Sequence, residues 1–72
     1  MANVVKIGTV PGSVKEVLVE DGATVREVIR LGGYEAQLAN YKVELNSNTV
    51  DLGQEVEDGD VISLLKKISA GA

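Results

Sequence analysis

The chain has 72 residues and a formal net charge of −4, and it contains neither cysteine nor histidine. This inventory excludes disulfides, thiolate metal sites and histidine-based catalysis. The acidic balance argues against nucleic acid as a partner. Twelve Val residues, with no Phe and no Trp, favour strands around an aliphatic core. We expect one small domain without a cofactor or a metal ion.

The N-terminal part of the chain predicts a β-hairpin. Residues 4–10 and 14–19 alternate as two strands, and the Pro-Gly-Ser sequence between them is typical of a tight turn. The alternation directs Val17 and Val19 toward the core. Gly8 interrupts the first strand, and we interpret it as a β-bulge in preference to a close approach of two backbones.

A short helix is predicted after the hairpin. Thr24 followed three residues later by Glu27 fits a capping box. The two glycines at 32 and 33 are typical of a helix end. An apolar stripe at helical spacing is formed by Val25, Val28, Ile29 and Leu31.

The second half of the chain predicts three further strands. We interpret residues 34–40 as a loop with one helical turn. Alternation predicts strands over residues 41–45 and 49–50, and a last strand over residues 61–68. The last strand is apolar nearly throughout, which is typical of the centre of a sheet.

The predicted order β-β-α-β-β-β indicates an α+β domain, with one mixed sheet and one helix packed across one of its faces. The domain covers residues 1–68, and residues 69–72 form a flexible tail. The right-handed crossover rule places the first and last strands side by side in the middle of the sheet. The helix residues Val25, Val28 and Ile29 are expected to pack on Ile7, Val17, Val19, Val43, Ile62 and Leu64.

The acidic residues do not predict a catalytic or metal site. Glu16, Glu20 and Asp21 have no base, nucleophile or oxyanion donors beside them, so catalysis is not expected. A second acidic run, from residue 55 to residue 60, lacks the spacing of a calcium loop. We interpret it as a solvated loop in which Asp58 and Asp60 brace a turn through side-chain hydrogen bonds to the backbone.

Several segments resemble the β-grasp (ubiquitin-like) family. They are residues 20–25 before the helix, residues 43–46 followed by Val50, and residues 57–62 entering the last strand. Within that family the chain is similar to the small sulfur-carrier and ubiquitin-like modifier proteins, which include the carriers of thiamine and molybdopterin biosynthesis. The resemblance implies the β-grasp fold and protein partners, an adenylating enzyme among them.

The tail departs from the family pattern. The resemblance implies a C-terminal Gly-Gly whose carboxylate is adenylated and then converted to a thiocarboxylate or an amide. This sequence has Ala70, Gly71 and Ala72 instead. We therefore expect that the chain is neither adenylated nor conjugated, although Gly71 and Ala72 remain candidates for contact with a partner.

The last strand also predicts a partner surface. If Ile62 and Leu64 face the helix, Val61 and Leu65 must face the open side of the sheet, where exposed aliphatic area favours binding. Lys66-Lys67 is either a patch for an acidic partner or ordinary surface charge. The predicted partner-binding residues are Val61, Leu65, Lys67, Leu18 and Val4.

Three functions stay open at this point, none of them enzymatic. The leading hypothesis is a non-catalytic interaction module that binds partners through its open sheet face and tail. The second is a sulfur carrier or ubiquitin-like modifier with an atypical C-terminus. The third is a small structural subunit of a multi-chain assembly, a viral one included, and self-association stays open. A helix needs about 20 apolar residues to span a bilayer, and no apolar run in the sequence approaches this length. We therefore expect a cytoplasmic location, or one within an assembly formed there.

Overall fold

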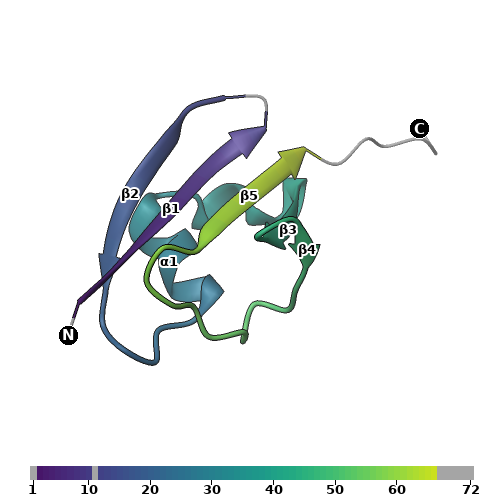
Figure 1. Ribbon diagram of the computed structural model, residues 1–72. Helices are drawn as coiled ribbons and strands as arrows, with labels where there is room; N and C mark the ends of the chain where they lie inside the picture. Colours follow the sequence, from purple (N-terminus) through teal and green to yellow (C-terminus); the bar gives the residue numbers. More distant parts are fainter. Residues whose placement is uncertain (1, 11, 67–72) are drawn as a thin grey trace, which may run out of the picture.

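The computed structural model describes residues 2–10 and 12–66 (Figure 1). The predicted order of elements is confirmed, with a 3₁₀ helix added before the third strand. The elements are β1 (Asn3–Val10), β2 (Val14–Val19), α1 (Val25–Gly32), η1 (Glu35–Asn40), β3 (Tyr41–Leu45), β4 (Asn48–Thr49) and β5 (Val61–Lys66).

The described strands form one mixed sheet in the order β2-β1-β5-β3-β4. The central strands β1 and β5 are parallel, and every other neighbouring pair is antiparallel. Figure 1 shows α1 lying across one face of this sheet. The α+β architecture predicted from the sequence is therefore confirmed, including the central pairing of the first and last strands.

The core lies between α1 and the sheet. The predicted strand residues Ile7, Ile62 and Leu64 are fully buried there. Val43 is only partly buried, although it packs against the core. Leu31 does not belong to the core, since its side chain is 54% exposed. The apolar stripe of α1 consists of Val25, Val28, Ile29 and Gly32.

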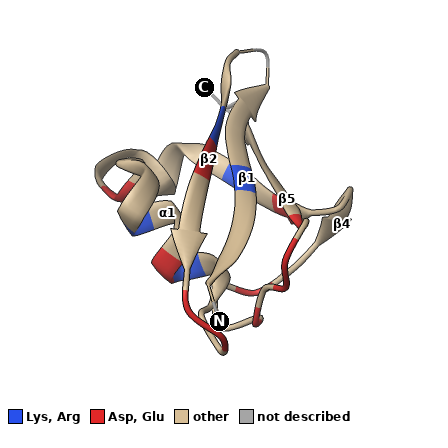
Figure 2. Cartoon of the chain, turned by 60° about the vertical axis from the view of Figure 1, so that its left-hand side comes forward, with Lys and Arg blue, Asp and Glu red and all other residues tan. Residues whose placement is uncertain are grey.

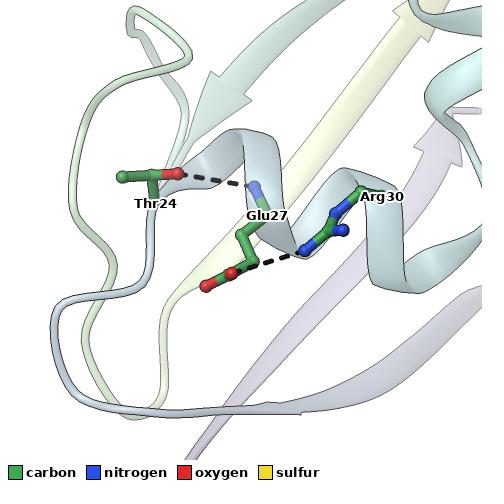
Figure 3. A network of polar contacts seen from close by, with 3 residues as sticks. All are labelled: Thr24, Glu27 and Arg30. Atoms are coloured by element: carbon green, nitrogen blue, oxygen red, sulfur yellow. Dashed lines mark hydrogen bonds and ion pairs between the residues drawn. The ribbon is translucent and has the colours of Figure 1, made fainter.

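Both ends of α1 are capped, and Figure 3 shows the N-terminal cap. The Thr24 hydroxyl accepts a hydrogen bond from the backbone N–H of Glu27 at 3.4 Å, as a helix N-cap requires. The Glu27 carboxylate lies 3.5 Å from the guanidinium of Arg30, so this side chain braces the exposed helix surface. At the other end Gly33 has a φ of 87°, a left-handed conformation that glycine adopts without strain.

The connection from α1 to β4 differs from the prediction in two details. Residues 35–40 form a 3₁₀ helix of six residues, where the sequence predicted a loop with one turn. The short strand β4 begins at Asn48 because the preceding turn is tight, with Asn46 and Ser47 both at positive φ. A turn with positive φ at two successive residues matches the twist of the strands in a β-hairpin.

The acidic turn before β5 is tied to the start of β1. The Asp60 carboxylate accepts a hydrogen bond from the backbone N–H of Glu57 at 2.7 Å. The Asp58 carboxylate accepts one from the backbone N–H of Val4, also at 2.7 Å. Asp60 therefore braces the turn as predicted, whereas Asp58 bonds the turn to the backbone of β1. Together the two bonds fix the point at which β5 enters the sheet.

Candidate functional site

The face of the sheet opposite α1 is the surface that the sequence singled out for binding. Side chains alternate between the two faces along each strand, so Ile62 and Leu64 are buried under the helix while Val61 and Leu65 lie on the open face. This assignment of the two faces of β5 agrees with the alternation expected from the sequence.

One group of apolar side chains lies near the turn that leads into β5. Val4 on β1 is directly opposite Leu18 on β2. The next residue of β1 on this face, Lys6, lies between Glu16 and Val61. Val4, Leu18 and Val61 are called the turn-side group below.

A second apolar pair lies at the other end of the central strands. Val10 on β1 is opposite Leu65 on β5, and Leu65 is opposite Lys42 on β3. Val10 is 50% exposed, Leu65 is half-buried and Lys42 is exposed. The pair formed by Val10 and Leu65 is called the tail-side pair, because the chain runs on from Lys66 toward its C-terminus.

Gly8 separates the two groups in the middle of the face. It pairs regularly with Val14 on one side and Ser63 on the other, so the β-bulge expected at this glycine is wrong. A Cβ atom at Gly8 would lie 2.5 Å from the carbonyl oxygen of Ser13 and 2.9 Å from the Cα of Val14. The glycine is required because two backbones approach closely here.

The predicted site residues therefore divide among three settings. Leu18 is 67% exposed and Val61 is 37% exposed, whereas Val4 and Leu65 are half-buried. The remaining predicted residues lie outside the described part of the chain: Lys67, Gly71 and Ala72.

The sequence analysis missed Val10 and Lys42 as part of this surface. Val10 is the last residue of β1, and nothing in its local sequence tells which residue of β5 it meets. The parallel register of β1 and β5 brings it opposite Leu65. Counting forward from the buried Ile7 in alternating steps would have placed Val10 on the open face, but it would not have identified Leu65 as its partner.

Charge is distributed unevenly around this face. Acidic residues gather on the loops that precede α1 and β5, away from the tail-side pair (Figure 2). Lys42 lies beside the tail-side pair, and its ammonium is 3.7 Å from the Glu44 carboxylate. The end of the open face that carries Val10 and Leu65 is therefore the less acidic end.

The described residues lack two features that often accompany a reaction centre. None of their polar or charged side chains is buried, and they contain no group of three side chains that could hold a metal ion. A shallow hollow of about 380 Å³ lies between β3 and residues 49–52, but it is widely open to solvent. No helix in the described ranges has the length and hydropathy needed to span a bilayer. The open face of the sheet is therefore the feature that we consider as a candidate binding site.

Comparison with known proteins agrees with the fold. The ThiS family model matches residues 6–71. A search of curated protein sequences finds no relative. The chain is similar to three solved archaeal structures that are at most 21% identical to it, so these likenesses support the fold alone.

The putative molybdopterin converting factor subunit 1 of Pyrococcus furiosus has a TM-score of 0.73 at 17% identity, over 92% of this chain and 99% of that one. The small archaeal modifier protein 1 of H. volcanii has a TM-score of 0.76 at 16% identity, over 92% and 99%. The Caldiarchaeum subterraneum ubiquitin has a TM-score of 0.72 at 21% identity, over 99% and 100%. All three align over nearly their whole length, so the similarity covers the entire β-grasp domain.

Proposed function

Because the chain belongs to the ThiS family, we propose that it is a non-catalytic protein-binding domain of the sulfur-carrier or ubiquitin-like modifier type. Its partner is an adenylating enzyme, which it meets through the open face of the sheet. The match of the ThiS family model to residues 6–71 supports this class of function.

The observation that carries the proposal is the tail-side pair. Val10 and Leu65 lie opposite each other at the carboxyl ends of β1 and β5, on the face that α1 leaves open. Removing a large aliphatic side chain completely from water contributes about 1.5–3 kcal/mol, so covering this pair would stabilise a complex. Lys42 at the margin would favour an acidic group on the partner.

The test is a binding titration with an adenylating enzyme from the same organism. Val10→Asp and Leu65→Asp should each weaken binding by about tenfold or more, because a charge would be desolvated at the interface. Leu31→Asp is the matched control, since Leu31 is an exposed leucine on α1. Its variant should bind like the unchanged chain.

A melting curve of each variant separates loss of binding from loss of fold. Val10→Asp should disturb the fold less than Leu65→Asp, because Val10 is exposed whereas Leu65 is half-buried. If Val10→Asp folds and binds the enzyme at full strength, the open face is not the docking surface. If Leu31→Asp weakens binding instead, the partner contacts the helix side.

A second assay distinguishes the carrier from a simple interaction module. Adenylation of a carboxylate releases pyrophosphate from ATP, so the enzyme would catalyse exchange of labelled pyrophosphate into ATP only when its carrier is present. Exchange that depends on this chain would support the carrier or modifier function. Binding without exchange would support the interaction module.

A further inference from the structure

The edge strand β2 carries a second candidate surface, separate from the tail-side pair and independent of the proposed function. β2 pairs with β1 alone and forms one edge of the sheet. It is six residues long, whereas β4 at the opposite edge has two. Natural sheets commonly protect an edge by shortening its last strand, and β2 lacks this protection.

The backbone of β2 can accept another strand. In an antiparallel pair every second residue directs its N–H and C=O toward the neighbouring strand, so the alternate residues of β2 direct theirs outward. Proline and glycine are both absent from Val14–Val19. A partner segment in extended conformation could therefore pair along the whole strand.

The side chains along this edge indicate the charge of the partner. On the open face Glu16 lies between Val14, which is 59% exposed, and Leu18. No described residue forms an ion pair with Glu16. Glu20 follows directly after the strand and adds a second carboxylate nearby. Lys6 on β1 is directly opposite Glu16 but forms no ion pair with it, so the outermost described side chains on the open side of this edge are apolar and acidic.

The opposite side of the edge does not offset this charge. The Lys15 ammonium donates a hydrogen bond to the backbone carbonyl of Gly32 at 2.7 Å. It also lies 5.0 Å from the centroid of the Tyr34 ring. Its charge is engaged at the C-terminal end of α1, beneath the sheet.

A second copy of the chain fits this edge poorly. In an antiparallel pair, directly opposite side chains point to the same face of the sheet. When β2 of one copy pairs with β2 of a second copy, two registers near the middle of the strand meet this condition. One places the two copies of Glu16 directly opposite each other, and the other places them on a diagonal. Both bring like charges together, which destabilises cross-strand pairing.

We propose that the free edge of β2 binds an extended segment of a partner protein by strand addition, with a basic side chain of that segment opposite Glu16. The segment alternates basic residues on the open face with apolar residues on the helix side, where Val17 and Val19 are buried. Main-chain hydrogen bonds hold it, and the charge selects it.

A synthetic peptide of alternating Val and Lys residues is the probe, and the same peptide with Glu in place of Lys is its charge control. Backbone amide resonances of Val14–Val19 should shift with the Lys peptide, and the Glu peptide should bind more weakly. Methylating alternate backbone nitrogens of the Lys peptide should abolish binding, since strand addition needs these donors.

The protein variants test the charge. Glu16→Lys should weaken binding of the Lys peptide by about fivefold or more at low salt and strengthen binding of the Glu peptide. Glu35→Lys, the same change in η1, should leave both affinities unchanged. Leu65→Ala, which adds no charge, should also leave them unchanged, which separates this site from the tail-side pair.

Three results would overturn the proposal. One is the absence of saturable binding at about 1 mM Lys peptide. Another is a set of shifted resonances that maps to β3 or the tail-side pair. The third is equal loss of affinity in Glu16→Lys and Glu35→Lys, which would indicate attraction to the acidic chain as a whole.

Discussion

The two faces of β5 present similar residues to very different surroundings. Ile62 and Leu64 are fully buried beneath α1, whereas Val61 and Leu65 lie on the face that no described element covers. Hydropathy alone does not separate the two sets. Their difference in role arises from the alternation of the strand and from a helix that covers one face only.

The largest expected effect is a contrast between two neighbouring residues. Ile62→Ala should lower the free energy of unfolding by about 2–4 kcal/mol, because it leaves a cavity in the core. Val61→Ala should lower it by less than about 1 kcal/mol, because Val61 already contacts water. Urea denaturation measures both values. Equal losses would contradict the assignment of the two faces.

The middle of the open face should not accommodate an added methyl group at Gly8. Gly8→Ala would place a methyl group against the carbonyl of Ser13, so we expect a loss of about 1–3 kcal/mol in unfolding free energy. Ser63→Ala, opposite Gly8 on β5, is the control and should be nearly neutral. Full stability of Gly8→Ala in thermal unfolding would show that the hairpin can open at this point.

The N-terminal cap tests how firmly α1 covers its face. Thr24→Ala removes the hydroxyl that accepts from the Glu27 N–H, which should cost about 1 kcal/mol. Thr24→Ser retains the hydroxyl and should retain most of the stability. If a melt shows the same loss of stability in both variants, the effect comes from the lost methyl group and not from the cap.

The smallest expected effect is at the other end of α1. Lys15→Met removes the hydrogen bond to the Gly32 carbonyl and the charge near the helix C-terminus, which should lower the free energy of unfolding by about 0.5–1 kcal/mol. Lys15→Arg keeps the charge and should recover part of the loss. Because the contact is electrostatic, added salt should reduce the difference in unfolding free energy between the unchanged chain and Lys15→Met. A difference that does not depend on salt would contradict an electrostatic origin.

The sequence predicted the fold because its local signals agree with one another. The alternation of β1, β2 and β3, the cap at Thr24 and the turn at Asp58–Asp60 all favour the same arrangement. Leu31 was misplaced because a short helix leaves little periodicity to fix the edge of its apolar stripe. Gly32 occupies the buried position instead, and a glycine gives no hydrophobic signal.

The candidate surface could be predicted only in part. Strand alternation identifies Val61 and Leu65, but the partnership of Leu65 with Val10 depends on the register of two strands separated by most of the chain. The same non-local pairing explains Gly8, whose close contact is with the hairpin backbone. Lys67, Gly71 and Ala72 lie beyond the described residues, so their predicted roles stay predictions.

The most direct test of the account is methyl NMR of the isotope-labelled chain during titration with the adenylating enzyme. We predict that the methyl resonances of Val10 and Leu65 shift or broaden first, while those of Leu31 on α1 stay in place. Changes confined to Leu31 and its neighbours, with Val10 and Leu65 unaffected, would contradict the claim that the open face of the sheet is the binding surface.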